Sequence, residues 1–223
     1  MSTKSNFKQQ LFAQFARVGK ALSHGNRLEL IEFLAQAERS VEELAVVANL
    51  TVANASQHLQ QLRQAGLVIT RKQGTKVYYS LSGDDVLSLF ESTRQVAERH
   101  LADVGQLMET YLHTKDNLES LPRKELLARV RDDLVTVIDV RPPLEYAVGH
   151  VPGAMNIPID ELEQRLGELD PGQVIVAYCR GPHCILAFDA VAYLRQKGLT
   201  ARRLEDGYPE WKAAGLPVEE GKR

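Results

Sequence analysis

The sequence is poor in cysteine and contains no long apolar run. Its 223 residues include two cysteines, which cannot form a disulfide framework. No stretch reaches the roughly eighteen consecutive apolar residues of a membrane span, and the N-terminus lacks the apolar run of a secretory signal. We therefore expect a cytoplasmic protein with no membrane partner. In a reducing compartment, two neighbouring thiols are more often reactive or metal-binding than structural.

Acidic residues are missing from one segment of a chain whose net charge is only −2. Between residues 51 and 80 there is no Asp or Glu, whereas the basic residues there are Arg63, Arg71, Lys72 and Lys76. A basic segment in an otherwise balanced chain predicts a surface that faces an anionic partner. A solvated face without a partner is the alternative.

The first half of the chain contains a series of helical patterns. Apolar residues recur every three or four positions over 7–22 and again over 26–38. Ser40 and Glu43 have the spacing of a capping box at the start of a short helix, and a further helix is expected over 51–66. Two short helices with a tight junction predict a helix-turn-helix.

The predicted helix over 51–66 presents short polar side chains that can reach base edges in a major groove. After it, two β-rich runs over 67–81 flank Gly74 and predict a β-hairpin wing with cationic flanks. We expect base contacts above all from Gln57 and His58, and phosphate contacts from the wing. The predicted DNA-binding set is Asn54, Ser56, Gln57, His58, Gln60, Arg63, Arg71, Lys72 and Lys76.

Over residues 6–113 the chain resembles the ArsR/SmtB group of winged-helix transcriptional repressors, through NRLELIEFL, TVANASQHLQQLRQAGLV and TKVYYSL. The resemblance implies double-stranded operator DNA as a partner and a homodimer built from the first and last helices, expected over 7–22 and 84–112. The amphipathic pattern over 84–112 independently suits a dimer interface. The third helix has no sulfur ligand, and His100 with Asp103 makes too small a set for a metal site, so no metal is expected.

The second half of the chain has a different pattern. Residues 114–121 are polar and are predicted to be a linker. Continuous apolar, β-branched runs over 134–140 and 173–178 predict strands buried on both faces of a parallel sheet. Helix-period segments are expected at 160–169, 185–198 and 208–215. The predicted fold is a mainly α winged-helix DNA-binding and dimerisation domain over 1–113 and an α/β domain with a parallel sheet over 122–223.

The rhodanese (sulfurtransferase) resemblance extends over about residues 120–220, through IDVRPPLEYAVGHVPGAMNIP, LEDGYPEWKAAGLP and the loop CRGPHC. It implies that Cys179 accepts a sulfane sulfur and carries it as a persulfide, without a cofactor. A strand end followed by a tight loop and a helix directs amide groups at one point, so we expect an accessible Cys179 thiolate there. Arg180 is expected to guide anions. The predicted catalytic residues are Cys179, Arg180 and Cys184, and the predicted substrate-binding loop is Arg180, Gly181, Pro182, His183 and Cys184.

The loop departs from the common rhodanese pattern, because Pro182 removes an amide donor and Cys184 stands where an Arg or Ser often lies. This departure weakens the expected anchoring of thiosulfate. Cys184 itself has three interpretations: a small apolar residue in the first turn of a helix, a resolving thiol, or half of a metal or arsenic clip with His183. As a resolving thiol, it attacks a persulfide on Cys179 and expels hydrosulfide, which requires Cα atoms within about 4.4 to 6.8 Å.

From these features we expect a transcriptional regulator that senses reactive sulfur or redox state through a persulfide on Cys179. One alternative is a working sulfurtransferase with an autoregulatory DNA-binding domain, and a second is arsenate or related oxyanion reduction by the thiol pair. The expected small-molecule partner is a sulfane-sulfur donor or a thiol. The polar residues of the framing segments are interpreted mainly as structural, namely Asp139, Arg141, Glu145 and His150.

Overall fold

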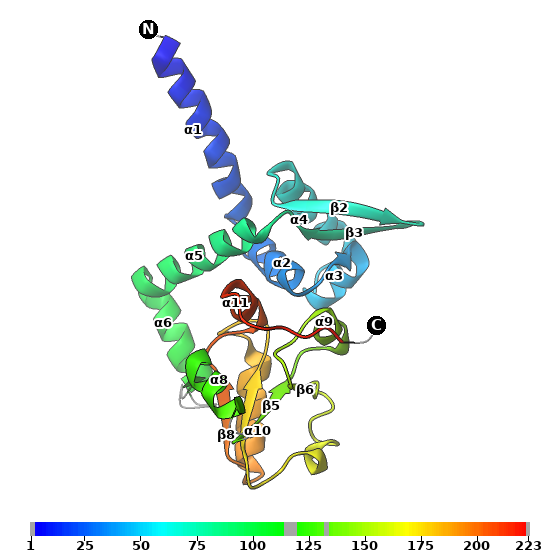
Figure 1. Cartoon of the computed structure of the whole chain (residues 1–223). Coiled ribbons are helices and arrows are strands. Elements are labelled where there is room, and N and C mark those ends of the chain that lie inside the picture. The colour runs from blue at the N-terminus through cyan, green and yellow to red at the C-terminus, as the bar shows by residue number, and fades with distance from the viewer. Residues whose placement is uncertain (1–2, 114–119, 132–133, 222–223) are drawn as a thin grey trace. The chain divides into compact units, whose positions relative to one another are not determined.

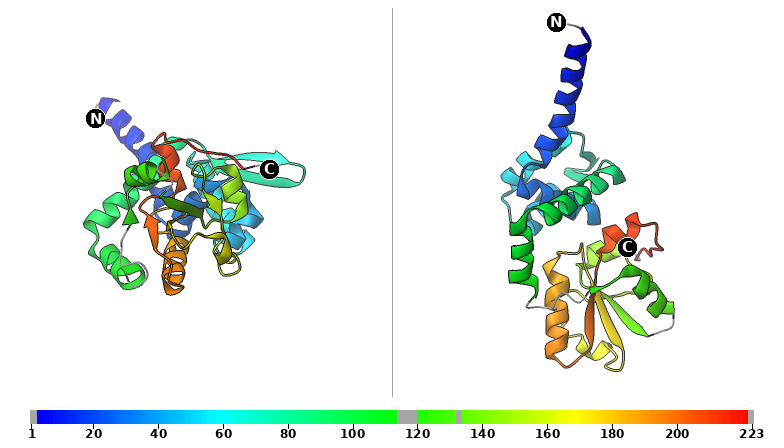
Figure 2. Two further views of the ribbon diagram at one scale, coloured as in Figure 1. Left: turned by 60° about the horizontal axis from the view of Figure 1, so that its bottom comes forward. Right: turned by 90° about the vertical axis from the view of Figure 1, so that its left-hand side faces the viewer.

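The computed structural model describes residues 3–113, 120–131 and 134–221 (Figure 1). The chain divides into two compact units, Met1–Gln95 and Val96–Arg223, and Figure 2 gives two further views of their elements. None of the described helices is both long and apolar enough to cross a membrane.

The first unit combines helices with a small antiparallel sheet. Its helices are α1 (Thr3–Leu22), α2 (Gly25–Gln36), α3 (Val41–Val47), α4 (Val52–Gln64) and the larger part of α5 (Asp84–His100). Among the described residues, the strands of its sheet are, in spatial order, β1 (Arg39–Ser40), β3 (Lys76–Leu81) and β2 (Val68–Gln73).

Local capping explains where the helix-turn-helix begins and ends. Ser40 Oγ accepts a hydrogen bond from the Glu43 amide at 3.3 Å, and the Glu43 carboxylate accepts one from the Ser40 amide at 2.7 Å. At the start of α4, Thr51 Oγ1 accepts a hydrogen bond from the Asn54 amide. Gly66 follows α4 with φ +78°, a left-handed conformation that glycine adopts without strain. The predicted winged helix-turn-helix is therefore confirmed.

The helix predicted over 84–112 is not continuous, and this prediction is corrected. α5 ends at His100, Leu101 has an extended backbone, and α6 (Ala102–Met108) is followed by a π-helical turn, Glu109–His113. Basic residues in the last turn of α5 and an acidic residue in the first turn of α6 favour a helix end and a new start here, because they oppose the partial charges of the helix termini.

The second unit contains a five-stranded parallel sheet in the described residues. In spatial order its strands are β4 (Ser120–Leu121), β8 (Ala201–Leu204), β7 (Val174–Tyr178), β5 (Val135–Asp139) and β6 (Met155–Asn156). Its remaining helices are α8 (Arg123–Arg131), α9 (Pro143–Val148), α10 (Ile185–Gln196) and α11 (Tyr208–Ala213). The predicted parallel α/β fold is confirmed. Most of the predicted linker lies outside the described residues.

The two faces of this sheet are covered by different helices (Figure 2). Ile138 and Ile175 pack against α10, whereas Val137 and Val176 pack on the opposite face with Leu126 of α8 and Trp211 of α11. Because both faces are covered, every position of the central strands favours an apolar side chain. This accounts for the continuous apolar runs of the sequence.

The helix predicted over 160–169 is absent from the structure, and this prediction is also corrected. The segment forms turns and a short 3₁₀ helix, Leu166–Glu168, around two buried leucines. Gly167 lowers the helical preference of the segment, and the Arg165 guanidinium donates to the Asn156 carbonyl at 2.8 Å. This long-range hydrogen bond holds the segment beside β6 instead of in a helix.

Candidate functional site

Most of the polar residues predicted on α4 share its exposed face. Ala55, Leu59 and Leu62 are completely buried and attach the opposite face of the helix to the core. The exposed side chains are Asn54, Gln57, Gln60 and Arg63, whereas Ser56 is half-buried. The exposed face can therefore present hydrogen-bonding groups to base edges in a major groove.

His58 does not belong to that face. The residue is only 7% exposed, and its ring centroid lies 4.4 Å from that of His24. Burial, together with the nearby His24 and Arg27, lowers the pKa of His58. The prediction that His58 contacts bases is corrected, because it follows Ala55 by three positions and thus lies on the buried stripe of α4.

The cations of the wing differ in their partners. Arg71 forms an ion pair with Glu38, with 2.5 Å between Nη2 and Oε1, and its guanidinium lies 5.2 Å from the centre of the Tyr78 ring. Lys72 and Lys76 are exposed and form no ion pair with any residue that the structure describes. Of the three predicted wing cations, these two lysines are therefore the ones whose charge remains available to a phosphate.

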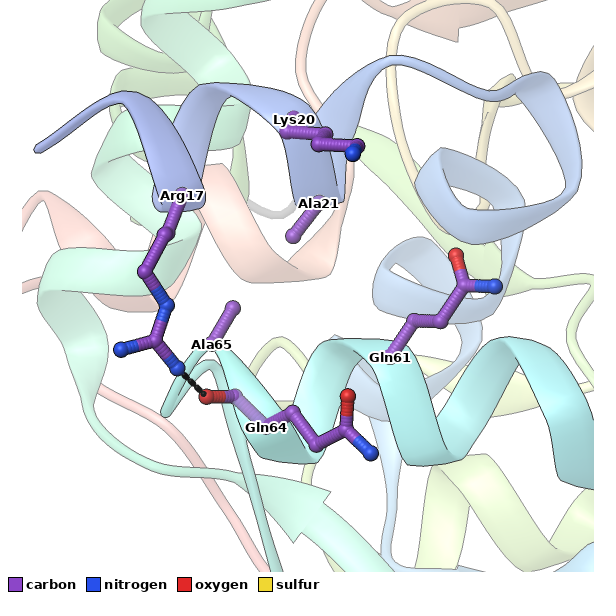
Figure 3. A pocket seen from close by; sticks show the side chains of 6 residues that line it. All are labelled: Arg17, Lys20, Ala21, Gln61, Gln64 and Ala65. Carbon is purple, nitrogen blue, oxygen red and sulfur yellow. Dashed lines mark hydrogen bonds between the residues drawn. The ribbon is translucent and has the colours of Figure 1, made fainter. Parts of the chain in front are cut away.

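A cavity of about 390 Å³ lies between α1 and α4 (Figure 3). It is lined by Arg17, Lys20, Ala21, Gln61, Gln64 and Ala65. Arg17 Nη2 donates to the Gln64 carbonyl at 3.0 Å across its edge. The sequence contains no local signal for this cavity, because it joins two helices that are far apart along the chain.

The two cysteines lie at the two ends of one loop at the carboxyl edge of the parallel sheet. Cys179 directly follows β7, and Cys184 is the N-cap residue of α10. A disulfide joins them, with 6.1 Å between the Cα atoms. This separation lies within the range of about 4.4 to 6.8 Å that a disulfide requires.

The expectation of an accessible Cys179 thiolate does not hold in this oxidised structure. Cys179 is 1% exposed and packs in the core beside Val140 and Ala177, because it continues the buried face of β7. Cys184 is only half-buried. A thiolate can form at Cys179 only after the disulfide has been reduced.

The loop nevertheless contains amide groups that can stabilise an anion. In the described part of the chain, the amides of Gly181, Ile185 and Leu186 donate no hydrogen bond, and the Cys184 amide donates to the Gly181 carbonyl. Pro182 has no amide hydrogen. The unpaired amides at the start of α10 carry the partial positive charge of a helix N-terminus.

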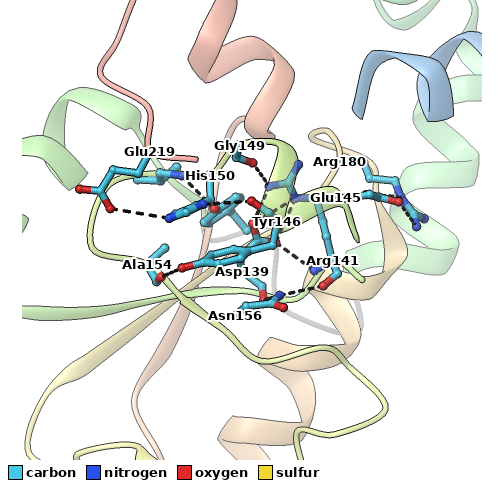
Figure 4. Close-up of polar contacts among 12 residues, drawn as sticks. Asp139, Arg141, Glu145, Tyr146, Gly149, His150, Ala154, Asn156, Arg180 and Glu219 are labelled. Atoms are coloured by element: carbon cyan, nitrogen blue, oxygen red, sulfur yellow. Dashed lines mark hydrogen bonds and ion pairs between the residues drawn. The ribbon is translucent and has the colours of Figure 1, made fainter. Parts of the chain in front are cut away.

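Arg180, which we expected to guide anions, forms a bidentate ion pair with Glu145 (Figure 4). The Arg180 side chain is 13% exposed and that of Glu145 is completely buried, with 2.8 Å between Nη2 and Oε1. The Glu145 carboxylate therefore compensates the charge of Arg180. The pair links α9 to the loop Cys179–Cys184, called the sulfur loop below, so Arg180 contributes to holding this loop in place.

A second buried ion pair, between Arg141 and Asp139, lies beside the first one (Figure 4). Arg141 Nη2 approaches Asp139 Oδ2 at 2.6 Å and also donates to the Gly149 carbonyl. His150 Nδ1 lies 3.0 Å from the Tyr146 carbonyl oxygen. These contacts confirm the interpretation of the framing residues as charge pairs and turn hydrogen bonds.

Arg203 also supports the loop and was missed by sequence analysis. Its Nη1 atom donates to the Pro182 carbonyl at 3.2 Å, and its guanidinium lies 4.1 Å from the centre of the Phe188 ring. Because the residue stands in an ordinary strand pattern, only the fold reveals that β8 runs beside the sulfur loop.

Gly207 allows the chain after β8 to approach the sulfur loop closely. A Cβ atom at this position would collide with the backbone of Arg180 and Gly181. The next residue, Tyr208, donates its amide hydrogen to the Cys179 carbonyl at 3.0 Å. Gly207 lies within the segment LEDGYPEW that supported the rhodanese resemblance, so a signal for it was present in the sequence.

The described residues contain no group of three or more His, Cys, Asp or Glu side chains that could hold a metal ion. His183 is half-buried within the loop. The chemistry that the arrangement can support is therefore that of a thiol pair next to amide donors.

Comparison with known proteins covers both units. Residues 24–70 match the arsR family of bacterial regulatory proteins, and residues 122–214 match the rhodanese-like domain family. The HTH-type transcriptional regulator Rv0324 of Mycobacterium tuberculosis is 47% identical over 221 residues, which cover 99% of this chain and 97% of that protein.

Two further similarities each cover one unit. A sulfurtransferase of Allochromatium vinosum is 31% identical over 104 residues, or 46% of this chain and 94% of that protein. The homodimeric winged helix-turn-helix DNA-binding domain of a possible ArsR-family regulator from Mycobacterium bovis is 44% identical, with a TM-score of 0.42 over 45% of this chain and 94% of that chain. The two family matches and the near-complete match to Rv0324 show that this chain belongs to the ArsR family of transcriptional regulators, in a form that carries a C-terminal rhodanese-like domain.

Proposed function

We propose that this regulator binds operator DNA as a homodimer and senses reactive sulfur or redox state through Cys179 and Cys184. The observation that carries the proposal is the disulfide between the only two cysteines of the chain. Because both cysteines belong to the rhodanese-like unit, the chemical signal arises there and biases the winged-helix unit between bound and released states. Operator DNA as the target places this activity in the cytoplasm.

The sensing chemistry begins from the reduced pair. The Cys179 thiolate attacks the outer sulfur of a persulfide RSSH, forms a new S–S bond and releases the thiolate RS⁻. The Cys184 thiol then attacks the Cys179 sulfur, so that the disulfide closes and hydrosulfide leaves. A peroxide reaches the same disulfide through a sulfenic acid, without added sulfur.

Exposed apolar side chains on α1 support a homodimer. Phe7 is 67% exposed, and Phe12 and Phe15 are exposed to a similar extent. Figure 1 shows α1 extending well beyond the other elements of its unit. An apolar patch of this kind on a soluble regulator favours a protein interface, and a second copy of α1 has the same chemistry.

Catalytic sulfur transfer is the alternative function, and the similarity to a sulfurtransferase favours it. The loop provides only weak electrostatic attraction for the thiosulfate anion, because Glu145 compensates the charge of Arg180. We therefore expect stoichiometric loading of sulfur instead of turnover at the rate of a dedicated enzyme. Assays with thiosulfate or 3-mercaptopyruvate as donor and cyanide as acceptor distinguish the two functions.

Operator footprinting across a polysulfide titration tests the sensing function. The wild-type protein is expected to change its operator occupancy, whereas Cys179→Ser is expected to show none of this change. Cys184→Ser is the matched control, because it still accepts sulfur on Cys179 but cannot close the disulfide. If Cys179→Ser responds like the wild type, Cys179 is not the sensor.

A further inference from the structure

The two disulfide-bonded cysteines differ in their exposure. Cys179 is 1% exposed and surrounded by the core that lies between the sheet and α10. Cys184 is half-buried, and the next residue, Ile185, is 49% exposed at the start of α10. Thiol exchange requires the incoming thiolate to reach one sulfur of the bond, so access decides which sulfur it attacks.

Unpaired amides of the loop can stabilise the cysteine that leaves. When an external thiolate bonds to Cys184, the electron pair of the broken S–S bond remains on the Cys179 sulfur. The loop that follows Cys179 provides the unpaired Gly181 amide, whereas the unpaired amides of Ile185 and Leu186 directly follow Cys184, the N-cap residue of the twelve-residue α10. Amides and a helix N-terminus stabilise a thiolate. Because such groups lie in the chain next to both cysteines, the difference in exposure decides which sulfur is attacked.

We infer that Cys184, and not Cys179, is the sulfur at which an external monothiol opens the disulfide. This inference rests on the proposed function, for which it supplies the step that resets the sensor. A first thiolate RS⁻ forms a mixed disulfide with Cys184 and releases Cys179 as a thiolate. A second RS⁻ attacks the sulfur of the attached R group, releases the Cys184 thiolate and forms RSSR, so two thiols are oxidised as the protein disulfide is reduced.

The order of release has a consequence for the sensor. Cys179 becomes free while Cys184 is still blocked by the small thiol. In this intermediate Cys179 can accept a sulfane sulfur, but Cys184 cannot resolve it.

Peptide mapping of the oxidised full-length protein tests the inference with glutathione as the probe. Glutathione is added for short times, the reaction is quenched with acid, and free thiols are alkylated. Trypsin cleaves after Arg180, so Cys179 lies in the peptide 166–180 and Cys184 in the peptide 181–195. Extrapolated to zero time, we expect at least about tenfold more glutathione on 181–195 than on 166–180, with the alkyl group on Cys179.

The same oxidised chain unfolded in denaturant is the control, because both sulfurs are then exposed and the preference is expected to disappear. Preferential labelling of Cys179, or equal ratios in the folded and unfolded protein, would overturn the inference. Operator binding of the oxidised and reduced protein is measured in parallel. Labelling of Cys184 with unchanged operator binding would refute the sensing function and leave the order of attack intact.

Discussion

At the scale of single residues, paired charges dominate the site. Arg180 is bonded to Glu145 and Arg71 to Glu38, so neither cation is available in full to an anionic ligand. In the loop between the cysteines and at the start of α10, unpaired amides remain as anion-stabilising groups. The chemistry of the loop therefore depends on backbone geometry more than on a side-chain cation.

The buried ion pair makes the rhodanese-like unit sensitive to Arg180. Arg180→Met leaves the buried Glu145 carboxylate without this partner, and we expect the free energy of unfolding to fall by about 3–5 kcal/mol. Adding Glu145→Gln removes the buried charge and is expected to recover part of the loss. Urea unfolding is followed by the fluorescence of Trp211, which is the only tryptophan and is buried in this unit.

Arg129→Met is the control for this cycle, since its ion pair with Glu125 is partly exposed and contributes about 0–1 kcal/mol. Equal effects of Arg180→Met and Arg129→Met would contradict the structural role assigned to the buried pair.

His58 makes the winged-helix unit less stable at low pH. Burial, His24 and Arg27 lower its pKa below the ordinary value of 6.5 in the folded state. As the pH falls below about 6.5, the unfolded chain therefore binds a proton that the folded chain resists, and the free energy of unfolding decreases. Urea unfolding is followed by far-ultraviolet circular dichroism. Between about pH 7.5 and 5.5, the free energy of unfolding should decrease less for His58→Gln than for the wild type. Identical losses would exclude His58 as the group responsible.

At the scale of elements, α4 and the wing present different chemistry to DNA. Exposed amide side chains lie on α4, whereas uncompensated cations lie at the tip of the β2–β3 hairpin. Amides discriminate between base edges, and lysines attract any phosphate. Specificity and general affinity are therefore expected to depend on separate elements.

Substitutions in these two elements should have different effects on binding. Gln57→Ala is expected to cost about 1–3 kcal/mol at the preferred base pair and to relax specificity there. Lys76→Ala should weaken all duplexes alike and reduce the salt slope by about one. Fluorescence anisotropy with a selected duplex and a scrambled duplex at several salt concentrations measures both effects.

Arg71→Ala is the matched control for the wing, and its effect on the salt slope should be smaller because Glu38 already compensates Arg71. Equal weakening of all sequences by Gln57→Ala would show that α4 does not read bases through this face.

The close approach of the chain after β8 to the sulfur loop is a second property at this scale. Gly207→Ala places a Cβ atom against the backbone of Arg180 and Gly181, so we expect a loss of about 1–3 kcal/mol and slower disulfide formation. Gly167→Ala is the control, because a Cβ atom there meets nothing within 4 Å. Trp211 fluorescence and alkylation of free thiols measure the two effects. Normal oxidation of Gly207→Ala would show that the loop tolerates displacement.

At the scale of the whole molecule, the two units have separate hydrophobic cores. One is built around Leu30, Leu44 and Leu59, and the cores of the other lie on the two faces of the parallel sheet. Separate cores favour separate unfolding transitions. The disulfide lies entirely within the second unit.

Reduction should therefore destabilise only the rhodanese-like unit. The disulfide spans five residues, and the loss of such a short loop closure corresponds to about 2 kcal/mol. We expect a reductant to shift the Trp211 transition by this amount and to leave the transition of the winged-helix unit unchanged. Cys184→Ser should be insensitive to reductant. A shift of both transitions would show that the two units unfold together.

A feature can be predicted from the sequence when residues close to it along the chain determine it. The caps at Ser40 and Thr51 and the placement of Cys179 after a strand were predicted correctly, because neighbouring residues determine them. His58 was predicted on the exposed face of α4 but lies on the buried face. Polar residues at the border between the two faces do not show how far the buried face extends. The pairing of Arg180 with Glu145 joins residues 35 positions apart and had no local signal.

The sequence by itself determined the two domains, their order and the elements that carry the DNA-facing and sulfur-bearing residues, because periodicity, capping and strand composition are local properties. Only the tertiary structure decided which of these residues are exposed, paired or joined. In the folded chain Cys179 is buried, Cys184 is more exposed, and Arg203 and Gly207 contact the loop. Packing between distant segments determines access and charge compensation, and no local pattern contains that information.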